Sequence, residues 1–337
     1  MRSQCAVYID AGYLLAAAAT RVTGTSLRSS VEVDHAGLIE AVIDQAERDS
    51  GLPLLRVNWY DSGARPGGLP DHTQDLIGLM SKVKLRLGRR SWSGEQKGVD
   101  LRIGLDLATH GRQRVVDVMY LVSGDDDLTE AVEEAQSHGV QVTLLVVPNH
   151  AGAPIAVARH LHRAADGMIL LDEEAVSRSV RSRSIPKELL PDLAPAEPTA
   201  GEEPGTAAQA APEVTTVEAP APAPTGSPIT PNVLAGKRPT TVIPPSPSGV
   251  VVPIPASEVP AEDVDAVVRQ VIEGWCRAAT PDSLASLRAG RPSIPGDLDR
   301  ALLMDLSNRT GLDDIPEPVR HALRDRFWIL ADKIRLG

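Results

Sequence analysis

The sequence contains few of the residues on which several classes of protein depend. Only two cysteines occur among 337 residues, Cys5 and Cys276, and they stand near opposite ends of the chain. So few cysteines suit reduced thiols in a cytosol and exclude a cysteine-rich metal site. The sequence has no uninterrupted apolar run long enough to cross a bilayer and no export signal. We therefore expect a cytoplasmic protein that does not enter the membrane.

Positive charge is also scarce. Lysine and arginine number 34 against 45 aspartates and glutamates, which gives a net charge of -11. A protein with this charge does not coat nucleic acid through bulk basicity, so any contact with a polyanion requires a local patch. The length of the chain leaves room for two domains, each with its own core.

Three consecutive aspartates follow an apolar segment in the first half of the chain. Residues 115–122 have the β-branched, apolar composition of a strand that is buried on both faces. Asp125, Asp126 and Asp127 come next and precede a stretch with helical spacing. An aspartate before a helix serves as an N-cap, which accounts for one or two of the three, with Asp126 as the expected cap. Because adjacent carboxylates repel one another, a bound divalent cation is the other interpretation.

Two further aspartates stand in similar positions. Residues 4–10 read as the first strand, and Asp10 ends it just before a helix of small residues. Asp100 stands in the first turn of a helix predicted to end at Gly111. The carboxyl ends of parallel strands face the ligand crevice of an open sheet, so we expect these aspartates and Asp125 to meet at one edge. Asp106 lies about 120° around its helix from Asp100 and is expected to play a supporting role.

Strands and helices alternate through the first half of the sequence, which predicts an α/β fold with a doubly wound, mostly parallel sheet. One predicted strand ends at Asp61, and we interpret this residue as part of a turn because a loop rich in glycine and proline follows it. The expected domain occupies residues 1–178.

The composition changes after this domain. Residues 179–257 are rich in proline and alanine without any helical or strand period, which predicts a disordered linker. Residues 258–337 contain three amphipathic stripes, at about 262–279, 297–309 and 317–335. They predict a small helical domain with Trp275, Phe327 and Trp328 in its core. We expect this domain to dock a protein partner or the substrate.

One local basic patch precedes Asp100. A cluster of this kind can hold phosphates, with Trp92 available to stack on a base, and it can equally protect an exposed strand edge from aggregation. The candidate RNA-binding residues of this patch are Lys82, Lys84, Arg89, Arg90 and Lys97.

Three short motifs together carry a family resemblance. The sequence YID ends the first strand, KGVD begins a helix at Asp100, and VSGDDDL follows a central strand. In this order the motifs resemble the NYN domain family of PIN-like nucleases, over about residues 4–172. The resemblance implies a three-layer α/β/α fold that binds divalent metal and hydrolyses RNA. It assigns Asp10, Asp100, Asp125 and Asp127 as catalytic and metal-binding residues, with Ser123 beside them.

The chemistry of these side chains is consistent with the resemblance. Oxygen ligands without histidine or cysteine favour Mg²⁺ or Mn²⁺ over Zn²⁺. We therefore predict a metal-dependent endoribonuclease, with RNA as its substrate. Tyr13 stands where the family often has asparagine, and this departure favours a second hypothesis, an inactive module that binds RNA or protein. A third hypothesis is a metal-dependent phosphatase that acts on small phosphoesters.

Overall fold

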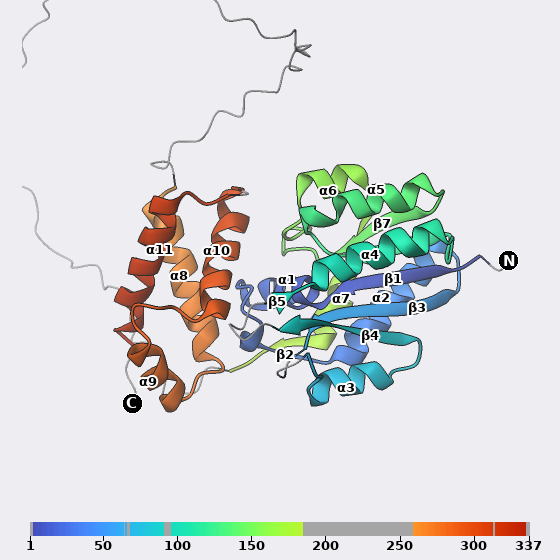
Figure 1. Ribbon diagram of the computed structural model, residues 1–337. Helices are drawn as coiled ribbons and strands as arrows, with labels where there is room; N and C mark the ends of the chain where they lie inside the picture. Colours follow the sequence, from blue (N-terminus) through green and yellow to red (C-terminus); the bar gives the residue numbers. More distant parts are fainter. Residues whose placement is uncertain are drawn as a thin grey trace, which may run out of the picture. The chain divides into compact units, whose positions relative to one another are not determined.

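The computed structural model describes residues 3–63, 65, 68–90, 96–184, 259–312 and 314–334, which Figure 1 draws in colour. They all belong to one compact unit that joins residues 1–192 to residues 255–337. The linker predicted at 179–257 lies outside the described residues except for residues 179–184. None of the described helices combines the length and the apolar character that a membrane crossing requires.

A seven-stranded sheet forms the centre of the first part of the described chain. Its strand order is β5-β4-β3-β1-β6-β7-β8, and every neighbouring pair is parallel except β4 and β5. The strands are β1 (Cys5–Asp10), β3 (Leu54–Ser62), β4 (Val83–Arg90), β5 (Gln96–Lys97), β6 (Val118–Val122), β7 (Gln141–Val146) and β8 (Gly167–Leu170). The chain order of the strands reverses at β1, which therefore lies between β3 and β6.

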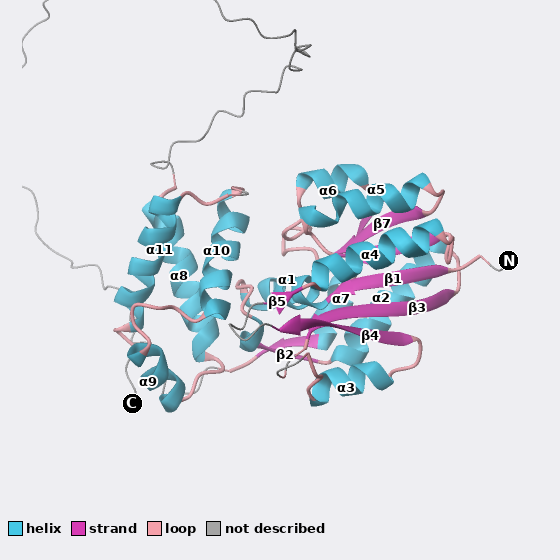
Figure 2. Ribbon diagram, in the orientation of Figure 1, coloured by secondary structure: helices cyan, strands magenta, loops and turns pink. Residues whose placement is uncertain are grey.

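Helices cover both faces of this sheet, as Figure 2 shows. Alternate residues of β1 point to opposite faces: Val7 and Ile9 enter one apolar core, and Ala6 and Tyr8 enter the other. The first core is closed by α1 (Ala11–Thr23), α2 (His35–Ser50), α3 (His72–Leu79) and α7 (Glu173–Ser179). The second is closed by α4 (Val99–Arg112), α5 (Thr129–Ser137) and α6 (Arg159–Ala164). The predicted three-layer α/β/α fold with a mostly parallel sheet is confirmed.

A second, two-stranded sheet extends this part of the chain beyond the predicted domain end at residue 178. Strand β9 (Val180–Ser182) pairs antiparallel with β2 (Val31–Val33), which follows the short 3₁₀ helix η1 (Arg28–Ser30). Neither strand was predicted, because three-residue strands are too short to show a period in the sequence. Folded structure therefore continues to residue 184.

The described C-terminal residues form four helices, α8 (Ala261–Cys276), α9 (Pro281–Ala289), α10 (Gly296–Thr310) and α11 (Glu317–Ala331). Of these, α8, α10 and α11 coincide with the three amphipathic stripes, and α9 was not predicted as a helix. Phe327 and Trp328 are buried and Trp275 packs against the same core, as expected. Leu27, from the segment before η1, belongs to this core and is only 3% exposed. The helical region is therefore packed against that segment.

Candidate functional site

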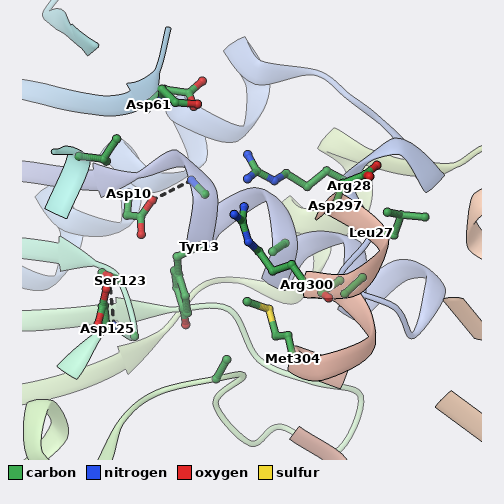
Figure 3. Close-up of a pocket in the computed structure, with 18 of the residues that line it drawn as sticks. Asp10, Tyr13, Leu27, Arg28, Asp61, Ser123, Asp125, Asp297, Arg300 and Met304 are labelled. Carbon is green, nitrogen blue, oxygen red and sulfur yellow. Dashed lines mark hydrogen bonds between the residues drawn. The ribbon is translucent and has the colours of Figure 1, made fainter. Parts of the chain in front are cut away.

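A pocket of about 520 Å³ lies where three parallel strands of the main sheet end. Asp10 is the last residue of β1, Asp61 is near the end of β3, and Asp125 follows β6. All three carboxylates line the pocket (Figure 3). Asp100, from the first turn of α4, lines it as well. The topology of the sheet thus brings together acidic residues that are up to 115 positions apart in the sequence.

Asp10 joins β1 to α1 and is half-buried. Its Oδ1 accepts a hydrogen bond from the backbone N–H of Gly12 at 2.8 Å, so the side chain caps α1. Burial raises the pKa of Asp10 from 3.8 to about 6, and the negative charge of Asp100 adds to this rise. A nearby cation would relieve both effects.

Asp125 occupies the turn between β6 and the 3₁₀ helix η2 (Asp126–Leu128). Its Oδ1 accepts a hydrogen bond from the backbone N–H of Asp127 at 3.1 Å, so Asp125, and not Asp126 as expected, caps η2. Burial raises the pKa of Asp125, and the charges of Asp100, Asp127 and Asp126 raise it further. Like Asp10, this carboxylate is held in place by a backbone hydrogen bond.

The residue before Asp125 is a glycine because the backbone comes very close to another segment there. A Cβ atom at Gly124 would lie 1.8 Å from the carbonyl oxygen of Ala156 and 2.9 Å from the ring of Tyr13. Ser123, the preceding residue, lines the pocket and places its Oγ 3.3 Å from the backbone N–H of Asp125. The Ser-Gly-Asp sequence thus sets the position of Asp125.

Asp100 belongs to α4, which covers the face of the sheet opposite to the face that α1 covers. Asp100 therefore lines the pocket from the other side of the sheet. Gly98, at φ 85°, turns the chain into α4, and the buried side chains of Ile103 and Leu107 fix this helix on the sheet. Asp100 is exposed in the first turn of α4, where the helix dipole favours a negative charge.

The other two acidic candidates lie outside the lining of the pocket. Asp127 is exposed at the start of η2. Asp106 accepts a hydrogen bond from the hydroxyl of Tyr60 at 2.8 Å and lies 3.5 Å from the guanidinium of Arg86. Asp106 therefore holds the helix face of α4 against β3 and β4.

Only part of the predicted basic patch can be placed. Lys82 and Lys84 are exposed at the start of β4, and the Nζ of Lys82 is 4.0 Å from Glu47. The side chains of Arg89, Arg90 and Lys97 lie outside the described residues, as does Trp92.

Sequence reasoning missed four charged residues that line the pocket, namely Asp61, Asp297, Arg28 and Arg300. Asp61 was interpreted as a turn residue, yet it stands at a strand end like Asp10, and burial raises its pKa. Its position at the end of a parallel strand was the signal that could have identified it. Arg28 and Arg300 also line the pocket, and nothing in their local sequence predicts this.

Tyr13, the one departure from the motif pattern described in the sequence analysis, forms a wall of the pocket. Its hydroxyl donates a hydrogen bond to the carbonyl oxygen of Ile155 at 2.9 Å. The side chain therefore connects α1 to the segment that also packs on Gly124. It takes a structural role at this position.

The donor set suits a hard divalent cation, although the site is not closed around one. Among the described residues, no three histidine, cysteine, aspartate or glutamate side chains are already arranged to coordinate a single ion. The carboxylates of Asp10, Asp100 and Asp125 nevertheless face one pocket and repel one another. Oxygen donors with uncompensated negative charge are the ligands that Mg²⁺ and Mn²⁺ prefer.

Comparison with known proteins agrees with the topology and the motifs. Residues 4–172 match the NYN domain family, and the chain belongs to this family. The family places the chain among nuclease-like proteins of the PIN fold.

Two individual proteins are similar to parts of this chain. The uncharacterized protein y4oD of Sinorhizobium fredii is 37% identical over 112 residues, which cover 33% of this chain and 51% of that protein. The chain thus spans about half the length of this curated relative. A crystal structure of a protein of unknown function from Vibrio parahaemolyticus is 20% identical, with a TM-score of 0.37, and the alignment covers 51% of this chain and 95% of that one.

Proposed function

We propose that this protein is a metal-dependent endoribonuclease whose active site is the acidic pocket. The observation that carries the proposal is the meeting of Asp10, Asp100 and Asp125 in one pocket at the ends of parallel strands. Burial and the neighbouring charge of Asp100 disfavour the charged forms of Asp10 and Asp125, because both effects raise the pKa of these two carboxyl groups. Family membership supports nuclease chemistry on a phosphodiester, and RNA is the substrate we infer.

Each carboxylate has a place in this proposal. Asp10, Asp100 and Asp125 would hold Mg²⁺ or Mn²⁺ directly or through water. Such an ion lowers the pKa of a bound water and stabilises negative charge on the leaving oxygen. Asp127, exposed beside the pocket, would hold a second, weaker ion or orient the attacking water. Ser123 supports Asp125 through the turn, and Asp106 acts only through the packing of α4.

The decisive experiment is cleavage of end-labelled RNA with Mn²⁺, with Mg²⁺ and with a chelator. We expect cleavage with either metal and none with the chelator. Asp125→Asn should lower the rate at least about 100-fold because it removes a ligand charge while leaving an oxygen to cap η2. Small phosphoesters serve as alternative substrates, and their preferential hydrolysis would indicate a phosphatase.

A matched control is available at the next position. Asp126 is an exposed aspartate outside the pocket lining, and its Oδ2 lies 3.2 Å from Nδ1 of His160. Asp126→Asn should therefore cleave RNA at the wild-type rate. Equal cleavage by the Asp125→Asn and wild-type proteins would show that the activity belongs to a contaminant or to another site.

Two observations favour an inactive binding module as the second candidate. Tyr13 departs from the family pattern described in the sequence analysis and donates its hydroxyl to the carbonyl oxygen of Ile155, and within the described part of the chain no three acidic side chains are arranged around one ion. RNA binding that persists in chelator, with no product formed in either metal, would establish this function instead.

A further inference from the structure

Two arginines from distant parts of the sequence extend into the acidic pocket. Arg28 belongs to η1, and Arg300 belongs to α10 of the C-terminal helical region. Figure 3 shows both side chains directed toward the side of the pocket where Asp10 lies. Both guanidinium groups therefore face the proposed reaction site.

Neither guanidinium has a partner in the described residues. No hydrogen bond or ion pair joins Arg28 or Arg300 to any described side chain or carbonyl, whereas several other arginines of the helical region are paired with aspartates. These pairs are Arg291–Asp332, Arg309–Asp263, Arg320–Asp314, Arg324–Asp299 and Arg326–Asp265. An unpaired arginine at the wall of a pocket is available to a ligand, and its planar guanidinium suits phosphate oxygens.

Arg28 lies close to the carboxylates. Its Nη2 is 3.8 Å from where a Cβ of Gly12 would be, next to the cap of Asp10. Its positive charge also acts on both Asp10 and Asp61. Arg28 can therefore attract a polyanion toward carboxylates that would otherwise repel it.

Arg300 is held at the pocket by contacts that fix α10. Asp305, one turn further along α10, is buried, and its Oδ1 accepts a hydrogen bond from the backbone N–H of Ser26 at 2.9 Å. On α8, a Cβ at Gly274 would lie 2.6 Å from Cγ2 of Thr25, which shows how closely this helix approaches the segment before η1. Leu27 of that segment is buried in the helical core. This segment leads directly into Arg28 and also anchors the helix that carries Arg300.

We propose that Arg28 and Arg300 bind backbone phosphates of the RNA that flank the phosphate attacked in the acidic pocket. The C-terminal helical region then forms one wall of the substrate site. This inference takes RNA as the substrate class from the proposed function. Any internal segment of RNA has phosphates on both sides of the bond that is cleaved. It accounts for two unpaired cations in a protein whose net charge is -11.

Binding of a fluorescein-labelled single-stranded RNA, followed by anisotropy at several salt concentrations, tests the inference. All variants carry Asp125→Asn so that the RNA stays intact. We expect Arg28→Ala and Arg300→Ala each to weaken binding about 10-fold and to reduce the slope of log K against log salt by about 0.7. Arg300→Lys should recover most of the salt slope because it keeps the charge.

Arg269→Ala is the matched control. Arg269 is an exposed residue of α8 that lies outside the pocket lining and forms no ion pair with the described residues. This variant should bind RNA like its parent. Thermal unfolding of every variant separates loss of a contact from loss of folding.

The outcomes distinguish this inference from the proposed function. If the wild type cleaves RNA and the Arg28 and Arg300 variants bind it as Arg269→Ala does, the inference is overturned and the nuclease proposal stands. If the arginine variants lose affinity but the wild type never cleaves, the phosphate contacts are real and the nuclease proposal fails. A wild type that neither binds nor cleaves RNA overturns both.

Discussion

Replacement of Asp10 by asparagine should stabilise the metal-free protein. Asparagine preserves an oxygen that accepts the hydrogen bond from Gly12, so the cap of α1 survives while the buried charge is lost. The pKa of Asp10 rises from 3.8 to about 6 on folding. A rise of this size corresponds to at most about 3 kcal/mol of destabilisation, since one pKa unit is worth about 1.4 kcal/mol.

The pH dependence of this effect has a defined sign. Below about pH 4, Asp10 is protonated in both the folded and the unfolded chain, and its titration costs nothing. Between about pH 4 and pH 6 the unfolded chain releases the proton while the folded chain keeps it, so the free energy of unfolding of the wild type falls. Above about pH 6 the cost is constant, and the advantage of Asp10→Asn should reach its maximum.

Urea unfolding in chelator, from pH 4 to pH 8, measures the difference between wild type and variant. Asp44→Asn on the exposed side of α2 is the control and should show little change at any pH. With Mn²⁺ at a concentration of 1,000 Kd the order should reverse, because only the wild type gains about 4.1 kcal/mol, which exceeds the cost of the Asp10 charge. An Asp10→Asn protein that is less stable than wild type at pH 8 in chelator would refute the claim that this carboxylate is held at an energetic cost.

Three further predictions concern the metal and the packing. Mn²⁺ should raise the melting temperature of the wild type but not of Asp100→Asn. A rise of the same size in this variant would show that Asp100 is not a metal ligand. Gly124→Ala should lose about 3 kcal/mol in urea unfolding, since its Cβ would lie 1.8 Å from the carbonyl oxygen of Ala156; an unchanged midpoint would show that this segment yields easily. Phe327→Ala should lose about 3–5 kcal/mol by the same measurement because the ring is 1% exposed in the helical core, and a loss below about 1 kcal/mol would contradict that burial.

The fold could be predicted because its signals are local and repeated. Buried strands such as β6 and β7 are short apolar runs, and amphipathic helices separate them. The order of these elements then restricts the topology to a parallel sheet with helices on both faces. The paired strands β2 and β9 escaped prediction, since each is three residues long and its partner is remote in sequence.

The site was only partly predictable, for reasons that differ between residues. The rule that acids at parallel strand ends converge applies to Asp10 and to Asp125, and it applies equally to Asp61, where the glycine- and proline-rich loop suggested a plain turn. Arg28 and Arg300 are different, because 272 positions separate them and only the packing of α10 brings them together. No local pattern encodes that packing.

The three adjacent aspartates show another limit of prediction from sequence. The sequence does not tell which of three neighbouring side chains faces a pocket. Capping and pocket lining are not alternatives for an aspartate. Asp10 and Asp125 each cap a helix and also line the pocket. A carboxylate has two oxygens, and a backbone hydrogen bond to one of them orients the other. If these carboxylates bind metal as we propose, the cap positions the ligand, and asparagine variants should fold normally and still lose the metal.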